Sequence, residues 1–160
     1  MMILERLSSF FTIVGGMLTD PLTMVILFGS VLLGILFGAM PGLTSTLGVA
    51  LLTALTYSMD TELAMVCLLA IYVGGTYGGS YASILINIPG TAASAATALD
   101  GYPLACKGEA GRAIGLTTTS SAIGTMISML FVVSISPIIS TFALQFTSFE
   151  FFLLAFFGIL

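Results

Sequence analysis

The fold of this chain is decided by the stretch from Gly74 to Arg112, GGTYGGSYASILINIPGTAASAATALDGYPLACKGEAGR. It opens as a glycine-rich apolar segment, is interrupted at residues 87–91 by Asn-Ile-Pro-Gly-Thr, and continues through small residues and hydroxyls. Apolar sequence flanks the stretch on both sides. Backbone groups exposed to lipid cannot be left without hydrogen bonds, so a non-helical break at membrane depth survives only inside protein or beside a water-filled cavity. The break is therefore a candidate binding site.

The composition is that of an integral membrane protein. Hydrophobic residues make up 58% of the 160 residues and charged residues 6%, with a mean hydropathy of +1.20; soluble domains are roughly 25% charged. Apolar runs of about 20 residues fit helices that cross the bilayer, whereas a β-barrel would show alternating strands of about 10 residues. The sequence predicts an all-α, polytopic helical membrane protein with broken or re-entrant helices at its Pro-Gly motifs. Its few scattered charges give no support for nucleic-acid binding.

We expect an N-terminal helix followed by a transmembrane domain. Residues 1–20 carry Glu5 and Arg6 among apolar residues at helical spacing, which favours an interfacial amphipathic helix over a signal peptide or a span. Residues 21–160 are then expected to form the transmembrane domain. Asp20 and Pro21 should start its first helix, as N-cap and first helical residue.

Three stretches of this domain are apolar and long enough to cross the membrane, namely residues 22–40, 63–86 and 112–136. Pro137 is expected to end the third span and leave residues 138–149 near the interface. Glu150 then begins another apolar segment, where the helix dipole favours an acid. Because residue 160 falls in the middle of this segment, we expect the chain to be the N-terminal portion of a longer transporter.

Glycines spaced four residues apart predict close helix packing. The first span carries Gly34 and Gly38, and residues 74–79 of the second span carry a doubled GxxxG pattern. Tyr77 and Tyr81 lie near the second set. Aromatic residues in a span serve packing or interface anchoring more often than ligand stacking, so we assign these tyrosines to packing.

Two Pro-Gly breaks have similar surroundings. GILFGAMPGLTST (34–46) and GSYASILINIPGTAAS (79–94) each pass from a glycine-bearing helix into Pro-Gly and then Thr and Ser. Residues 47–57 are too short to cross alone, as in a re-entrant or broken helix. In transporters, paired breaks place half-helix N-termini at an anionic substrate and freed carbonyls at a cation. The candidate substrate- or ion-binding residues are Pro41, Gly42, Thr44, Ser45, Thr46, Asn87, Pro89, Gly90, Thr91 and Ser94.

The same residues have a structural alternative. Capping of a half-helix would account for one hydroxyl in residues 44–46, and Asn87 could simply cap its break. No Lys, Arg or His lies within the interior of a span, so an anion would rely on backbone N–H groups and hydroxyls. With no histidine, and two cysteines without CxxC spacing, the sequence predicts no metal site, no cofactor and no enzyme activity.

The few basic residues suggest an orientation. Lys107 and Arg112 flank the loop after the second expected span, which predicts that this loop is cytoplasmic. If the N-terminus is also inside, residues 22–58 must cross the membrane once in net, which agrees with a broken or re-entrant segment there.

A set of short motifs makes the chain resemble a known family over about residues 29–152. They combine glycine, proline and small residues: Gly34-x3-Gly38-x2-Pro41-Gly42-Leu43, Gly78-Gly79-Ser80 leading to Asn87-Ile88-Pro89-Gly90-Thr91, Ser94-x-Ala96-Thr97, and Asp100-Gly101-Tyr102-Pro103-Leu104-Ala105. With these motifs the chain resembles the large membrane subunit of the tripartite tricarboxylate transporters, the TctA-type proteins of bacteria.

The resemblance implies a function and partners. It implies a multi-pass protein of the bacterial inner membrane that takes up tricarboxylates or related carboxylates. A small membrane subunit and a periplasmic solute-binding protein would be its partners, and a sodium or proton gradient would drive uptake by symport, without ATP or a bound cofactor.

Two other functions fit parts of the sequence. A passive channel or pore would also use the hydroxyl-rich third span, and its flux would not depend on an ion gradient or a binding protein. A non-transporting membrane scaffold would need only the GxxxG pairs, and mutations in them would impair assembly without changing solute flux.

Overall fold

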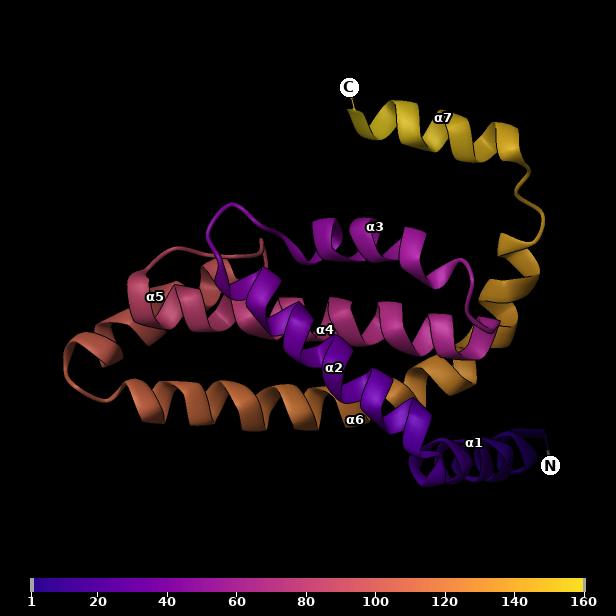
Figure 1. Ribbon diagram of the computed structural model, residues 1–160, viewed down its shortest axis with the longest axis horizontal. Coiled ribbons are helices and arrows are strands. Elements are labelled where there is room, and N and C mark those ends of the chain that lie inside the picture. Colours follow the sequence, from indigo (N-terminus) through magenta and orange to yellow (C-terminus); the bar gives the residue numbers. More distant parts are fainter. Residues whose placement is uncertain (1, 160) are drawn as a thin grey trace. The chain divides into compact units, whose positions relative to one another are not determined.

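The computed structural model describes residues 2–159, with side chains for residues 8–158, and all regular structure in this range is helical. The elements are α1 (Met2–Thr19), α2 (Pro21–Ala39), α3 (Ser45–Thr56), α4 (Thr61–Ile86), α5 (Ser94–Cys106), α6 (Ala110–Ala143) and α7 (Ser148–Ile159), shown in Figure 1. Of these, α2, α4 and α6 are long and apolar enough to cross a membrane. The predicted all-α membrane fold is confirmed.

The helices group into two compact units. One contains residues 2–11 and 122–159, and the other contains Thr12–Ser121. The second unit holds both Pro-Gly breaks, together with α2, α3, α4 and α5. Every candidate binding residue therefore belongs to one packed unit.

The start of α2 follows the expected capping pattern. The Asp20 carboxylate accepts a hydrogen bond from the backbone N–H of Thr23 at 2.9 Å, and Pro21 is the first helical residue. The Thr23 hydroxyl also donates to this carboxylate. These bonds favour the charged form, so they lower the pKa of Asp20 below its usual value.

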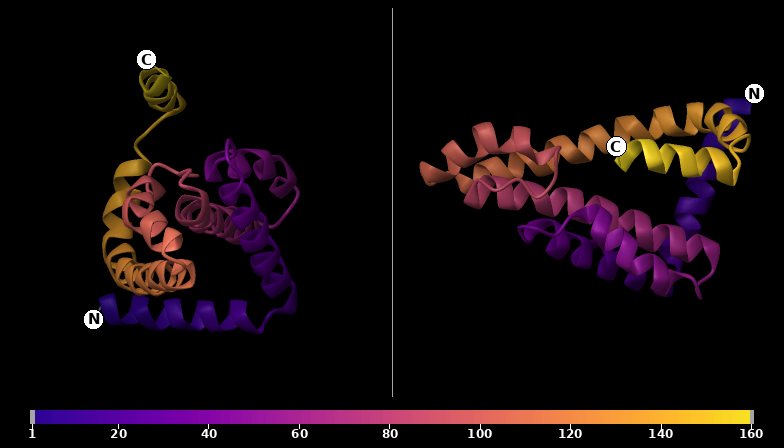
Figure 2. Two further views of the ribbon diagram at one scale, coloured as in Figure 1. Left: turned by 90° about the vertical axis from the view of Figure 1, so that its left-hand side faces the viewer. Right: turned by 90° about the horizontal axis from the view of Figure 1, so that it is seen from above.

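Glycines bring α2 and α4 into backbone contact, as their spacing predicts. A Cβ on Gly34 would lie 2.9 Å from the Gly75 nitrogen, and a Cβ on Gly38 would lie 2.9 Å from the Gly75 Cα. On the α4 side, a Cβ on Gly78 would lie 2.9 Å from the Ile35 Cα. Two helices can approach this closely only when side chains are missing at the crossing. Figures 1 and 2 show the crossing of α2 over α4.

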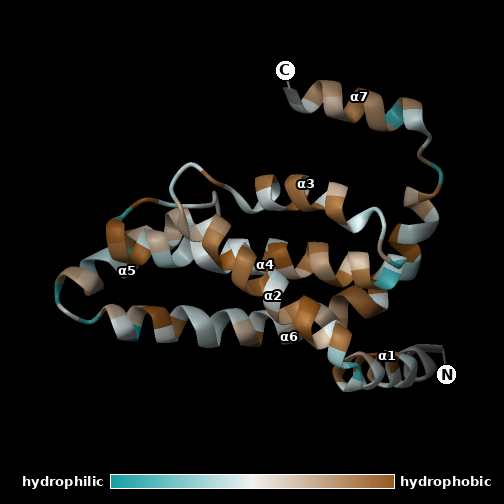
Figure 3. Ribbon diagram, viewed as in Figure 1, coloured by the Kyte–Doolittle hydropathy of each residue, from teal (hydrophilic) through white to brown (hydrophobic). Residues whose placement is uncertain are grey.

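One buried polar pair supports the same crossing. The Ser30 hydroxyl of α2 donates to the Cys67 sulfur of α4 at 3.2 Å, and both residues are buried. Around this contact the helices present mostly apolar residues outward, as the brown colouring of α2, α3 and α4 in Figure 3 shows. Such a surface suits lipid or neighbouring protein.

The expectation that Pro137 ends the third span is wrong. Helix α6 continues through Pro137 to Ala143, so residues 138–143 are helical and belong to it. Proline has a φ angle that a helix accepts, and it removes only one N–H donor. The Ser140 and Thr141 hydroxyls donate to the Pro137 carbonyl at 3.0 and 2.9 Å, which are the local bonds by which hydroxyls satisfy themselves within a helix.

The last helix begins with a partial capping box. The Glu150 carboxylate accepts a hydrogen bond from the Thr147 N–H at 2.7 Å and another from the Thr147 hydroxyl. This arrangement satisfies a donor that the first turn of α7 would otherwise leave free. The acid therefore lies in the first turn of α7, as the sequence predicts.

Candidate functional site

The second break starts where α4 ends. Asn87 follows Ile86 with a left-handed backbone, φ 56°, and its N–H donates to the Ala82 carbonyl. The Ile88 N–H reaches the same carbonyl at 3.5 Å. A left-handed residue with bonds back to the last turn is a usual helix C-cap, and asparagine tolerates it better than most residues. The Asn87 side chain is exposed and makes no hydrogen bond within the described chain.

The chain then doubles back along α4. A Cβ on Gly90 would lie 2.8 Å from the Cα of Gly79, and it would also collide with the carbonyl oxygen of Gly38. The second break therefore lies against the middle of α4 and against the end of α2. Because α2 ends at Ala39, just before Pro41, the two Pro-Gly breaks are neighbours in space.

The two short helices start from this place and run in opposite directions. Ser45, at the start of α3, packs on Gly75, and the next turn of α3 reaches Ile71, so α3 runs antiparallel to α4. Thr91 packs on Gly79, and Gly101 of α5 packs on Ile84, so α5 runs parallel to α4. Figure 1 shows α3 and α5 extending away from each other beside α4.

The two starting points lie close to each other along the α4 axis. Gly75 and Gly79 are separated by about one helical turn, which is a rise of about 6 Å. The N-terminal ends of α3 and α5 therefore lie about one turn apart along α4. Each end carries a partial positive charge and N–H groups without helical partners.

Hydroxyls cap the two helices in different ways. At α3, the Thr44 hydroxyl accepts from the Leu47 N–H at 3.2 Å and shares a 2.8 Å hydrogen bond with the Thr46 hydroxyl. At α5, the Thr91 N–H donates to the Ser94 hydroxyl at 3.0 Å, and the Ser94 N–H donates to the Thr91 hydroxyl at 3.2 Å. Capping thus accounts for several of the predicted hydroxyls.

The predicted site residues fall into two groups. Ser45 and Ser94 are buried, and Gly90 and Thr91 are half-buried, all around the Gly75–Gly79 turn. The others are exposed in the described chain and lie on the flanking loops or at the start of α3: Pro41, Gly42, Thr44, Thr46, Asn87 and Pro89.

Three residues that hold the breaks in place were assigned only to helix packing. Gly38, Gly75 and Gly79 each touch a break or a half-helix start through their backbone. Their GxxxG spacing signalled close packing, but nothing in the spacing indicated that loops as well as helices would use these surfaces.

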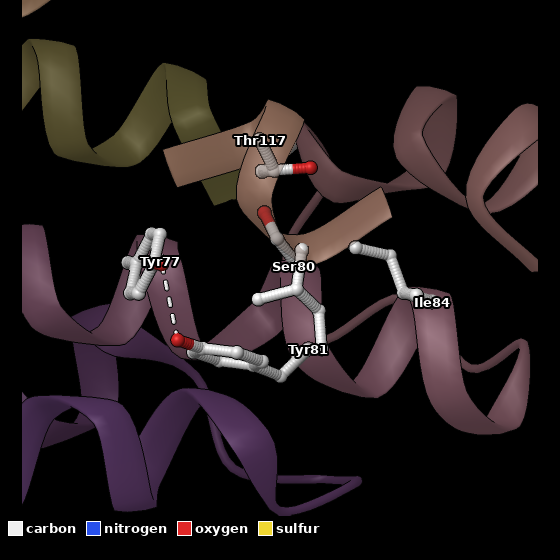
Figure 4. Close-up of a pocket in the computed structure, with 6 residues that line it drawn as sticks. Tyr77, Ser80, Tyr81, Ile84 and Thr117 are labelled. Atoms are coloured by element: carbon white, nitrogen blue, oxygen red, sulfur yellow. Dashed lines mark hydrogen bonds between the residues drawn. The ribbon is translucent and has the colours of Figure 1, made fainter. Parts of the chain in front are cut away.

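A hydroxyl cluster lies on another part of α4, against the start of α6 (Figure 4). The Tyr81 hydroxyl donates to the Tyr77 hydroxyl at 3.0 Å, and Tyr77 hydrogen-bonds to the Thr118 hydroxyl. Ser80 and Thr117 line the same small space, which is too narrow to hold a water molecule. The tyrosines therefore pack between α4 and α6, as their assignment to packing predicts.

Comparison with known proteins identifies the family. The sequence model of the tripartite tricarboxylate transporter TctA family matches residues 24–160. The chain belongs to the TctA family. The resemblance carried by the Pro-Gly motifs is thereby confirmed.

One curated relative is similar to the chain in sequence. It is an uncharacterized 52.8 kDa protein in the TAR-I ttuC' 3'region of Agrobacterium vitis, 38% identical over 140 residues. The match covers 88% of this TctA-family chain and 28% of the relative, so the chain spans less than a third of the relative's length. No solved structure matches the chain.

Proposed function

We propose that this chain forms part of the large membrane subunit of a secondary active uptake system for tricarboxylates or related carboxylates. A periplasmic binding protein would deliver the solute, a small membrane subunit would complete the complex in the bacterial inner membrane, and a sodium or proton gradient would drive uptake. Membership of the TctA family supports the transporter class.

The observation that carries the proposal is the pair of opposed helix N-termini at the Gly75–Gly79 turn. Free N–H groups and the helix dipole attract anions at such ends. No Lys, Arg or His lies in the interior of α2, α3, α4 or α5. A carboxylate would therefore be held by several modest hydrogen bonds and not by one ion pair, which suits a substrate that must also be released.

A cation could use the opposite ends of the long helices. Helices α2 and α4 both end at the breaks, and their last carbonyls carry partial negative charge. In broken-helix transporters such carbonyls coordinate sodium while helix N-termini hold the anion. In our proposal the end of α2, which lies against Gly90, brings such carbonyls close to the starts of α3 and α5, so that one site couples solute to ion.

Uptake by the full-length complex tests the proposal. Labelled mono-, di- and tricarboxylates would be supplied with and without sodium and proton gradients, and with and without the binding protein. We expect accumulation of a carboxylate that requires one gradient and the binding protein. Flux that ignores both would establish a passive pore instead. Loss of assembly with unchanged flux in glycine mutants would establish a scaffold.

A further inference from the structure

The two half-helix N-termini are not equivalent. At α5, the chain's own groups occupy the first turn: the Ser94 N–H bonds to the Thr91 hydroxyl, and the Ala95 N–H bonds to the Ala92 carbonyl at 3.3 Å. The Ser94 hydroxyl donates to the Thr91 carbonyl at 2.8 Å and accepts from the Thr91 N–H. Both hydroxyls are committed to this turn, so the α5 end offers little to a ligand.

The α3 end is open. Its first backbone hydrogen bond runs from the Gly48 N–H to the Thr44 carbonyl at 3.1 Å, and the Thr44 hydroxyl accepts a hydrogen bond from the Leu47 N–H. The N–H groups of Ser45 and Thr46 have no acceptor within the described chain. These two donors lie at the positive end of a 12-residue helix.

The Ser45 hydroxyl is the second observation that points to a ligand. Ser45 is only 4% exposed, yet its hydroxyl has no hydrogen-bond partner among residues 2–159. It faces Gly75, where an added Cβ would lie 3.1 Å from the Ser45 oxygen. In the described chain no fully enclosed side-chain oxygen lacks a partner, so the residual exposure of Ser45 includes this hydroxyl. The hydroxyl is therefore unpartnered in the described chain and accessible, which leaves it available to a ligand.

The chemistry of these groups selects an anion. Two N–H groups and a helix N-terminus attract an anion, and the Ser45 hydroxyl can donate a further hydrogen bond to it. We propose that the α3 N-terminus with the Ser45 hydroxyl binds a carboxylate group of the transported substrate, and that the α5 N-terminus, closed by its own hydroxyls, only holds the second break in place. This inference rests on the proposed function and assigns the coupling ion to another part of the site.

Substitution of Ser45 in the full-length complex tests this assignment. Ser45→Ala removes the hydroxyl and adds no atom, so we expect normal membrane abundance. The half-saturating carboxylate concentration should rise roughly ten- to a hundredfold, as for loss of one charge-assisted hydrogen bond. The half-saturating coupling-ion concentration should stay unchanged. Thr53→Val is the matched control, because Thr53 lies on the same helix and its hydroxyl bonds to the Val49 carbonyl at 2.7 Å.

Substrate protection gives an independent readout. In a complex whose native cysteines are replaced, Ser45→Cys places a thiol at the α3 end, and a small methanethiosulfonate reagent measures its accessibility. Saturating carboxylate should slow the modification, whereas the coupling ion alone should not. Unprotected modification, or an unchanged carboxylate affinity in Ser45→Ala, would overturn the inference while wild-type uptake still upheld the proposed function. A wild-type complex that transports no carboxylate would overturn both.

Discussion

Gly38→Ala is the sharpest test of the packing that holds the two breaks together. The added Cβ would lie 2.9 Å from the Cα of Gly75 and 2.6 Å from its carbonyl carbon, and both are backbone atoms that cannot rotate away. Ordinary contacts of a Cβ lie at 3.4–4 Å, and the Gly75 carbonyl oxygen would be closer to the added Cβ than either carbon, so α2 and α4 must separate at their crossing. Overpacking of this kind costs about 1–3 kcal/mol.

The measurement is the free energy of unfolding of the purified full-length protein, obtained by SDS titration in mixed micelles. Gly29→Ala is the control, because Gly29 lies on the same helix and nothing in the described chain is within 4 Å of its added Cβ. We expect that control to be neutral or slightly stabilising, since alanine favours a helix over glycine. If the two variants agree within about 0.5 kcal/mol, the glycine crossing does not carry the stability assigned to it.

Three further outcomes follow from the loop geometry. Gly42 has φ 90° and open space around it, so Gly42→Asn should retain uptake and Gly42→Leu should lose it, because asparagine tolerates a positive φ better than leucine does. At Gly90 a Cβ would collide with the backbone of Gly38 and Gly79, so substitution by either Asn or Leu should abolish uptake. Asn87→Ala should destabilise the protein by about 1 kcal/mol and lower its membrane abundance, because alanine tolerates the left-handed backbone at this position less well than asparagine. Asn87→Gly should restore the abundance, so that its uptake per molecule shows whether the asparagine amide touches a ligand. If the loop between α5 and α6 is cytoplasmic, Glu109→Cys in a background lacking both native cysteines should react with an impermeant thiol reagent in inverted vesicles and not in whole cells. Gly108 is a poorer position for the cysteine, because a side chain at its φ of 83° would strain the backbone.

Local sequence patterns were enough for most of the helices. Composition set the membrane class, because so few charges and so many apolar runs cannot form a soluble domain. Asp20 and Pro21 marked the start of α2 because capping depends on neighbouring residues only. Pro137 was misjudged because proline accepts a helical φ and removes only one N–H donor, so whether it ends a helix also depends on its surroundings.

The candidate site was only partly predictable. The Pro-Gly motifs located both breaks, since proline and glycine act on their own backbone. From the motifs, Thr44, Ser45 and Thr91 were all predicted to be binding residues. In the structure the hydroxyls of Thr44 and Thr91 accept backbone N–H groups at the helix starts, whereas that of Ser45 has no partner in the described chain. Which hydroxyl remains available depends on the turn that each half-helix adopts.

The sequence by itself determined the membrane class, most of the helices and the positions of the two breaks, because these follow from composition and from interactions within a few residues. Only the tertiary structure decided that the breaks meet at the Gly75–Gly79 turn, and that α3 and α5 leave it in opposite directions. Those features depend on contacts between backbone surfaces far apart in the chain. A glycine at a given spacing permits such an approach, but it does not specify which segment will make it.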